Sequence, residues 1–365
     1  MYHRVIPENL KDAYKAFDQV DMLLSFEGRK MVLGSARIEA EVEILGGVDL
    51  STNQIQLDGM VGGHSFFESF TTSVAGGNVI ENLTEYPRYA KMVSTATSGR
   101  SDMNNASNVC EMKAPLDEMT TQLLAGVNVP ASQPSSGAIS GLRPDFSIKP
   151  LICVNSGSGA LSYKKSGDVR ISFQLVRDFG ALFGNDMSAT TSYQLKDLRL
   201  RFLSVPEDNK DDSIVMKTKL NIKSSIQSSF ANIQTKVGRN ISAVSMSLQK
   251  QENENSAVNN NLTLDKVPGL TETQFLFNDS SNTLITYQIK NHPEVILRYI
   301  DSFMDTGRNK LSLTDLANNN GFGIGLDFGT ILDFSQNKIS VQLNSGVSSA
   351  TPLLAYMYFH SFVEL

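Results

Sequence analysis

The segment at residues 170–175, RISFQL, is nearly repeated at residues 338–343, KISVQL, about half the chain length away. In both segments three apolar residues alternate with polar ones, which is the period-two pattern of a strand with one buried face. The flanks repeat as well, because residues 159–175 align with residues 329–343 as a short strand, a polar turn and the matched strand. The chain therefore contains a duplicated β unit.

Further elements recur in the same order in both copies. Residues 85–100 and 292–308 each fit a helix that begins near a proline and ends before a glycine. The long strand-like runs at 193–205 and 353–365 also correspond. The first copy is longer between its helix and its matched strand, which places an insertion loop at 101–145. Loops of this length in compact domains are usually functional or exposed.

Other alternating stretches bring each copy to about eight short strands. The additional strands are predicted at 37–44, 54–58, 64–74 and 146–154 in the first copy, and at 213–223, 243–250, 273–277 and 283–290 in the second. Eight strands in two facing sheets form a jelly roll. The sequence therefore predicts an all-β protein of two tandem eight-stranded jelly rolls with short inserted helices.

One predicted element lies outside both copies. In residues 7–21, apolar side chains fall at helical spacing, and charged side chains occupy the other face. The apolar residues are Leu10, Ala13, Tyr14, Phe17 and Val20. We therefore expect an N-terminal amphipathic helix at 1–22, a first jelly roll at 23–206 and a second at 207–365. The mixed charges of the helix do not resemble the basic face of a strong anionic-membrane binder.

Composition and charge exclude several classes of protein. The chain has 365 residues, 41% hydrophobic and 19% charged, which is enough to bury the cores of two domains. A net charge of −6 and a pI near 5.4 argue against direct nucleic-acid binding. The charged N-terminus predicts no signal peptide, and no stretch is as long as a membrane span. The two cysteines, Cys110 and Cys153, fit synthesis in a reducing compartment such as a cytosol.

The sequence offers little for catalysis. The Gly-Gly-His stretch at 62–64 lacks the second histidine of a cupin-type metal site, so His64 is expected to be a hydrogen-bonded packing residue. Neither cysteine has a CxxC partner. No histidine lies near another in sequence: His3, His64, His292 and His360. We expect no catalytic residue, no cofactor and no metal.

Two further patterns have simple interpretations. The run GFGIGLDFG at 321–329 leads into strand residues rather than a helix, so its glycines predict close strand packing or a bend and not a phosphate loop. Two charged rows are expected to be solvated strand faces; alternatively, they meet across a subunit boundary. The rows are Glu39, Glu41 and Glu43, and Lys217, Lys219 and Lys223.

Several stretches resemble double jelly-roll major capsid proteins. GGHSFFESFTTSV at 62–74 and ENLTEYPRYAKMVSTATSGRSDMNN at 81–105 are similar to segments of the polinton and adintovirus type, within the group that includes tailless phages and adenoviruses. YQLKDLRLRFLSVP at 193–206 looks like the strand that closes the first jelly roll there. LLAYMYFHSFVEL at 353–365 is similar to the ending of tailless lipid-containing phage capsid proteins.

The resemblance implies a non-enzymatic viral major capsid protein. It implies homotrimers that form pseudo-hexagonal capsomers and tile an icosahedral shell in the virion, with synthesis in the host cytosol and assembly in the cytoplasm or nucleus. The 101–145 insertion would contribute to an outward tower. The N-terminal helix would lie on the inner side, near neighbours or an internal membrane. Vertex or minor capsid proteins would be further partners, and the genome would not be contacted directly.

The alternative is a jelly-roll carbohydrate-binding module, a hydrolase or a metal-dependent oxygenase. A carbohydrate hydrolase or an oxygenase would favour an aromatic cleft with tryptophan or a histidine pair, and the chain has no tryptophan. A secreted lectin-like module would favour a signal peptide and disulfides. The capsid interpretation is therefore preferred.

Overall fold

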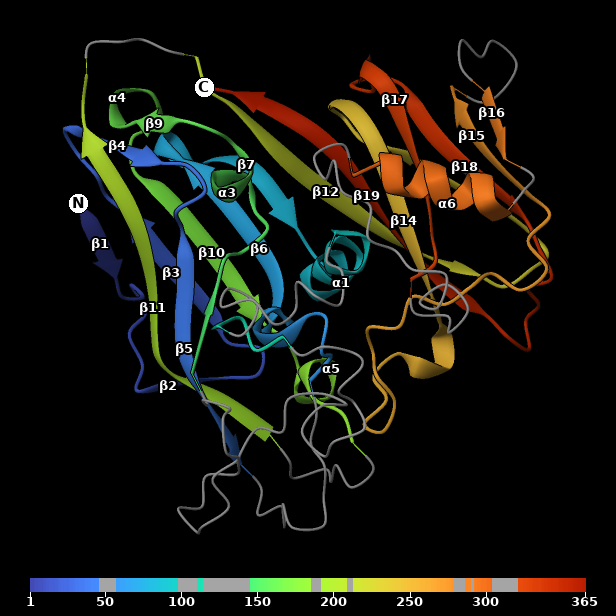
Figure 1. Ribbon diagram of the computed structural model, residues 1–365, viewed down its shortest axis with the longest axis horizontal. Helices are drawn as coiled ribbons and strands as arrows, with labels where there is room; N and C mark the ends of the chain where they lie inside the picture. The colour runs from blue at the N-terminus through green and yellow to red at the C-terminus, as the bar shows by residue number, and fades with distance from the viewer. Residues whose placement is uncertain are drawn as a thin grey trace.

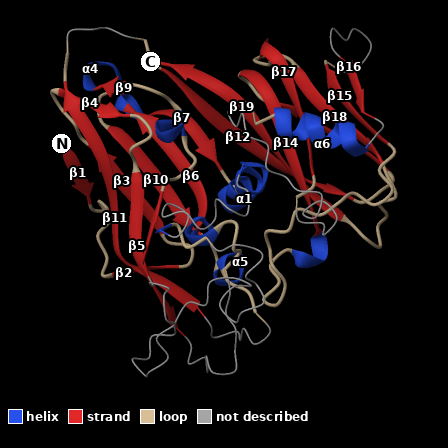
Figure 2. Cartoon of the chain, in the orientation of Figure 1, coloured by secondary structure: helices blue, strands red, loops and turns tan. Residues whose placement is uncertain are grey.

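Two β sandwiches lie side by side in the computed structural model, with helix α1 between them (Figure 1). Strands dominate both halves, as Figure 2 shows. The structure describes residues 1–45, 57–97, 110–113, 145–184, 192–208, 213–278, 286–289, 292–303 and 321–365.

The first sandwich is built from strands β1 to β11. One sheet has the order β8–β5–β11, with β2, β1 and β4 along the other edge of β11 and β9 beside β4. The facing sheet has the order β3–β10–β6–β7. The strands span Tyr2–Val5, Ala13–Lys15, Gln19–Leu24, Arg29–Val32, Arg37–Leu45, Phe67–Val74, Asn78–Leu83, Asp145–Ile148, Ala160–Ser162, Val169–Leu175 and Ser192–Pro206 in chain order.

The second sandwich repeats this topology with strands β12 to β19. Its sheets have the orders β12–β19–β14–β17 and β13–β18–β15–β16. The strands span Val215–Ile226, Phe230–Lys236, Asn240–Lys250, Glu272–Phe277, Thr286–Ile289, Gly323–Asp333, Lys338–Asn344 and Leu353–Glu364 in chain order. The repeated RISFQL and KISVQL segments lie in β10 and β18, which hold equivalent places in the two sandwiches. The predicted double jelly roll is therefore confirmed.

Both predicted inserted helices are present. Helix α1 (Tyr86–Thr97) follows β7, and helix α6 (His292–Asp301) follows β16. Shorter helices connect other strands: α3 (Cys153–Ser156), α4 (Tyr163–Ser166) and α5 (Asp178–Ala181). Short 3-10 turns cover Gly62–Phe66, Ala75–Gly77 and Gln251–Asn253. The insertion at 101–145 lies outside the described residues except for 110–113 and Asp145, so the predicted outward tower is not tested.

The predicted N-terminal amphipathic helix is wrong. Residues 7–21 contain strand β2 and the start of β3 instead, and β1 and β2 pair with β11. Leu10 and Phe17, assigned to the apolar helix face, are 70% and 63% exposed, and Phe17 has a φ of 67° that breaks a helix. Without β1 and β2, much of one edge of β11 would lack backbone partners, and this requirement outweighs the local periodicity.

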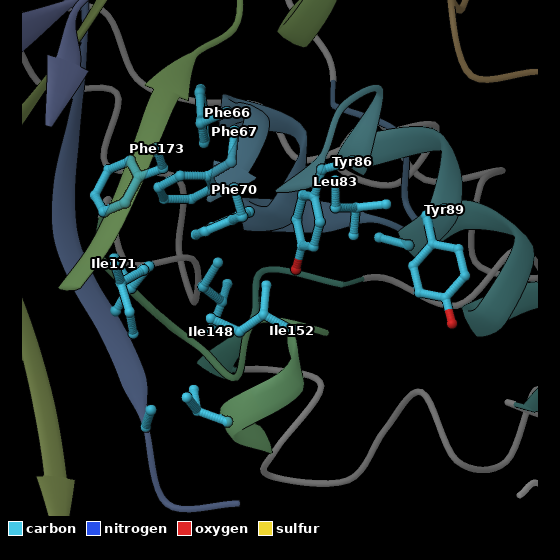
Figure 3. Packing of buried hydrophobic residues seen from close by; sticks show 14 of the residues in the cluster. Phe66, Phe67, Phe70, Leu83, Tyr86, Tyr89, Ile148, Ile152, Ile171 and Phe173 are labelled. Carbon is cyan, nitrogen blue, oxygen red and sulfur yellow. The ribbon is translucent and has the colours of Figure 1, made fainter. Parts of the chain in front are cut away.

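Aromatic side chains fill the core of the first sandwich. Phe67 lies 5.5 Å from Phe70 and 5.2 Å from Phe173 between ring centroids, and Phe70 lies 4.6 Å from Tyr86 (Figure 3). This apolar cluster continues past α1 to Tyr358 on β19 of the second sandwich. A separate apolar cluster fills the interior of the second sandwich. The two jelly rolls therefore share a buried boundary.

Candidate functional site at the junction of the two jelly rolls

Edge strand β7 of the first jelly roll lies against edge strand β12 of the second. Glu81 on β7 is fully buried and accepts hydrogen bonds from the backbone N–H groups of Lys219 (3.0 Å) and Cys153 (2.6 Å). Burial raises the pKa of Glu81, while the Lys219 ammonium, 3.9 Å away, acts in the opposite direction. One carboxylate thus satisfies backbone donors from both jelly rolls.

Arg88 on α1 is buried against the second jelly roll. Its Nη2 donates to Gln249 Oε1 and to the carbonyl of Asn261, both at 2.6 Å, and its Nη1 donates to the carbonyl of Thr263 at 3.2 Å. The guanidinium carbon lies 3.9 Å from the centroid of the Tyr356 ring. Arginine suits this position because its planar fork reaches several acceptors while its face stacks on an aromatic ring.

Lys91 anchors the same helix about one turn after Arg88. Its Nζ lies 2.6 Å from Asp58 Oδ2, and both side chains are almost completely buried. The same carboxylate accepts from Asn260 Nδ2 of the second jelly roll at 2.6 Å and from the Met60 N–H at 2.9 Å. A buried charge is tolerated when it is paired and hydrogen-bonded in this way. The ion pair therefore fixes α1 at the junction.

A small polar cavity of about 50 Å³ lies beside Arg88. Its lining includes Glu68, Glu85, Arg177 and Lys223, and Lys223 Nζ lies 3.3 Å from Glu85 Oε1. Burial raises the pKa of Glu68 to about 7, and the neighbouring Glu85 adds to this shift against the nearby basic groups. Glu68 therefore changes charge near neutral pH.

His64 forms a buried hydrogen-bonded cluster. Its Nδ1 lies 2.6 Å from Tyr86 Oη, and its Nε2 lies 3.3 Å from Glu111 Oε2, which also pairs with Lys113 at 2.9 Å. Burial lowers the pKa of His64, although the hydrogen bond to Glu111 opposes that shift. The prediction of a hydrogen-bonded packing histidine is confirmed. Glu111 belongs to the 101–145 insertion and ties part of it back to the first jelly roll.

The other histidines do not gather around His64. His3 lies 2.7 Å from Ser204 Oγ near the N-terminal edge. His360 on β19 lies 3.0 Å from Ser245 Oγ, and burial followed by nearby lysines lowers its pKa to about 3. The side chain of His292 lies outside the described residues. Within the described part of the chain, no three His, Cys, Asp or Glu side chains gather in a way that could hold a metal ion.

The two cysteines are separate. Cys110 is exposed and Cys153 is buried, where burial raises the pKa of the Cys153 thiol well above its usual value. A thiol that stays protonated is a poor nucleophile. Among the described helices, none has the length and apolar character needed to cross a membrane.

An apolar cavity of about 270 Å³ opens next to His360 at the same junction. Residues from α1, the segment after β8, the segment after α6 and the end of β19 form much of its wall: Tyr89, Val93, Leu151, Phe303 and Phe362. His360 is held neutral there, so it contributes a polar but uncharged surface.

The glutamate row pairs within its own sheet. Arg199 Nε lies 2.9 Å and Arg201 Nη2 lies 3.1 Å from the Glu39 carboxylate, and Lys196 Nζ lies 2.6 Å from Glu43. These pairs cross from β5 to β11, so the row is a cross-strand ion-pair ladder on a partly exposed face.

The lysine row is different from the predicted solvated face. Lys219 is buried at the junction beside Glu81, and Lys223 pairs with Glu85 and Glu254. Because Lys219 is enclosed within one chain, it cannot meet the glutamate row of another subunit. The hypothesis that the two rows meet across a subunit boundary is therefore wrong for this residue.

The glycines of the 321–329 run permit close packing, as predicted. A Cβ at Gly323 would lie 2.3 Å from ring carbons of Tyr299 on α6, and one at Gly325 would lie 2.4 Å from Ser302 Oγ. Gly329 has a φ of 65°, a conformation that other residues rarely adopt. Gly323 and Gly325 therefore let α6 lie directly on β17.

Three charged residues of the junction, Glu81, Arg88 and Lys91, were not singled out from the sequence. Glu81 is a charged residue beside the buried Ile80 and Leu83 of β7, and Arg88 and Lys91 interrupt the buried face of α1. Charges in apolar elements are the available signal, because lysine, arginine and glutamate are rarely buried without partners. Their partners are 138 and 161 residues away for Glu81–Lys219 and Arg88–Gln249, respectively.

Known structures share this architecture over the whole chain. PBCV-1 VP54, fitted into a cryo-EM reconstruction of the virophage Sputnik, aligns with 100% of this chain and 95% of its own, at a TM-score of 0.62 and 10% identity. The Faustovirus major capsid protein aligns with 100% of this chain and 90% of its own, at a TM-score of 0.61 and 8% identity. The mavirus major capsid protein aligns with 100% of this chain and 90% of its own, at a TM-score of 0.51 and 10% identity. No family model and no curated protein matches the sequence. The chain has the double jelly-roll fold of these capsid proteins.

Proposed function

We propose that the chain is a viral major capsid protein that forms homotrimeric, pseudo-hexagonal capsomers, which tile an icosahedral shell. The full-length similarity to the Faustovirus and mavirus major capsid proteins carries this proposal. The duplicated topology supports it, because three chains supply six similar units and a threefold trimer can then occupy a sixfold lattice position.

The junction gives this role a physical basis. Glu81, Arg88 and Asp58 hold the two jelly rolls together through buried hydrogen bonds, so each chain can present two jelly rolls in one fixed arrangement. We propose that the boundary between them follows residue 206, with β1 to β3 added to the first jelly roll. A structural, non-enzymatic role agrees with the protonated Cys153 thiol and the neutral His360 ring.

The proposed partners follow from this role. The chain binds copies of itself, and vertex or minor capsid proteins would close the shell. The acidic net charge favours a shell that does not contact the genome directly. A membrane contact through an N-terminal helix is not proposed, since that segment forms strands. We propose that the protein resides in the virion and assembles in the host cytoplasm or nucleus. No observation in the described residues favours a carbohydrate-binding module or hydrolase.

The solution mass of the purified full chain tests the proposal. We expect light scattering after size exclusion to give about 120 kDa, three times the 40.0 kDa chain, with pseudo-hexagonal outlines in negative stain. A monomer at every concentration examined would contradict the proposed capsomer.

A further inference from the structure

Within one chain, different edges of the two jelly rolls meet. The β7 edge of the first jelly roll contacts the β12 edge of the second, where the Thr84 N–H donates to Asn221 Oδ1 at 2.9 Å. Helix α1, which follows β7, places Tyr89 with its ring centroid 5.1 Å from that of Tyr358. The contact is therefore heterologous, because one roll contributes its β7-type edge and helix and the other its β12-type edge.

The equivalent edges at the two ends of the chain have no such neighbour within the described residues. By position in the shared topology, β16 corresponds to β7, and β1 and β2 correspond to β12. Strand β16 pairs with β15 alone, and β1 and β2 pair with β11 alone. Helix α6 follows β16 as α1 follows β7. Each chain thus has one further edge of each kind.

Exposed apolar side chains concentrate beside the first of these edges. Eleven large apolar side chains are exposed among the described residues, and five of them fall within the first seventeen residues. They are Met1, Tyr2, Ile6, Leu10 and Phe17. On α6, Leu297 is 58% exposed. Scattered apolar exposure is ordinary, but a concentration on one edge marks an interaction surface.

We propose that the β1–β2 edge and its exposed apolar residues bind the β16–α6 edge of a second copy of this chain. The contact repeats between chains the junction that β7, α1 and β12 form within one chain. A heterologous contact of this kind closes into a ring when its rotation fits, and three copies give a ring of six alternating jelly rolls. This assignment rests on the proposed capsomer and adds the surfaces that build it.

Charge substitutions at the two edges test the proposal. We expect the Tyr2→Glu/Leu10→Glu variant and the Leu297→Glu variant each to lose the 120 kDa species and to run as 40 kDa monomers. The matched control is Phe230→Glu, which changes another exposed apolar residue, on β13 and outside both edges, and should remain trimeric. Circular dichroism and thermal unfolding confirm that all variants stay folded, as expected for exposed positions.

Mixing the two monomeric variants gives the decisive result. The N-terminal variant keeps an intact β16–α6 edge, and the Leu297→Glu variant keeps an intact β1–β2 edge. In the mixture, one chain of each variant can join through these two intact edges, and the two altered edges then prevent further association. We therefore expect heterodimers of about 80 kDa, twice the 40.0 kDa chain mass, and no larger species. A mixture that stays monomeric overturns the pairing of these two edges.

A covalent test avoids destabilising substitutions. In a Cys110→Ser background, Leu10→Cys and Leu297→Cys together should be linked between copies by a bifunctional maleimide, while Phe230→Cys with Leu297→Cys should not. If the wild-type chain were itself monomeric in solution, the proposed function would be contradicted. A wild-type trimer whose edge variants remain trimeric and do not cross-link would overturn this inference alone.

Discussion

On strand β19 of the sheet β12–β19–β14–β17, Leu354, Tyr356 and Tyr358 belong to the apolar cluster of the first jelly roll. Neighbouring Ala355 and Met357 belong to the cluster of the second. Both faces of β19 are therefore buried. The equivalent strand of the first jelly roll, β11, has one buried face, and its other face carries the ion-pair ladder with Glu39 and Glu43.

The difference shows that topology does not decide which sheet faces become internal. The two sheets have equivalent strand orders, but small or aromatic residues on one face admit α1 and α6, whereas charges on the other keep it in contact with water. Burying the charged ladder would require desolvation of each ion. The residues on the outer face of each sheet, apolar in one and charged in the other, thus determine which sheet the helices can cover.

Breaking the buried anchor of α1 is expected to have the largest effect. Lys91→Met leaves the Asp58 carboxylate buried without its cation, which costs about 3 kcal/mol of unfolding free energy. Urea unfolding followed by circular dichroism measures the loss.

The matched control is Lys196→Met on the ladder, which removes a lysine from a pair with Glu43 on a partly exposed face. We expect a small fraction of the Lys91→Met loss, since ion pairs in contact with water contribute little. Equal losses at the two sites would show that the covered and uncovered faces do not differ as described.

A methyl group at the covered face should have the next largest effect. Gly323→Ala places a Cβ against the Tyr299 ring, and such overpacking costs about 2 kcal/mol. In a Tyr299→Ala background the same change should cost less than about 0.5 kcal/mol, because the ring that it meets is gone. A thermal-unfolding double-mutant cycle measures this coupling, and additive effects would place the strain elsewhere.

The sequence predicts the repeated parts of the fold well. RISFQL and KISVQL have one buried face each, so their alternation is visible locally, and they occupy equivalent strands β10 and β18. The helices at α1 and α6 are signalled by Pro87 and Pro293 near their starts. These features depend on neighbours in sequence, which is why pattern reasoning finds them.

The N-terminal strands and the junction could not be predicted in the same way. Strands β1 and β2 form because β11, almost two hundred residues away, has an edge to satisfy, while the spacing of Leu10, Tyr14 and Phe17 imitates a helix. The partner of Arg88 lies 161 residues along the chain. Long-range contacts of this kind outweigh local preference and leave only a misplaced charge as a signal in the sequence.

The smallest expected effect concerns Glu68 and depends on pH. Burial and Glu85 raise the pKa of Glu68 from 4.5 to about 7, so between these values the folded chain binds more protons than the unfolded chain. Stability therefore falls as the pH rises through this window. Glu68→Gln should match the wild type near pH 4.5 and exceed its stability by on the order of 1 kcal/mol above pH 7.

Urea unfolding of both proteins across this pH range measures the difference. Glu41→Gln, at an exposed position on the uncovered face, is the control and should follow the wild-type profile. The groups around Glu68 that could shift the window are Glu85, Arg88, Arg177 and Lys223. If Glu68→Gln gave a constant offset at every pH, the titration would belong to another group, and the polar cavity beside Arg88 would not be the pH-dependent part of the junction.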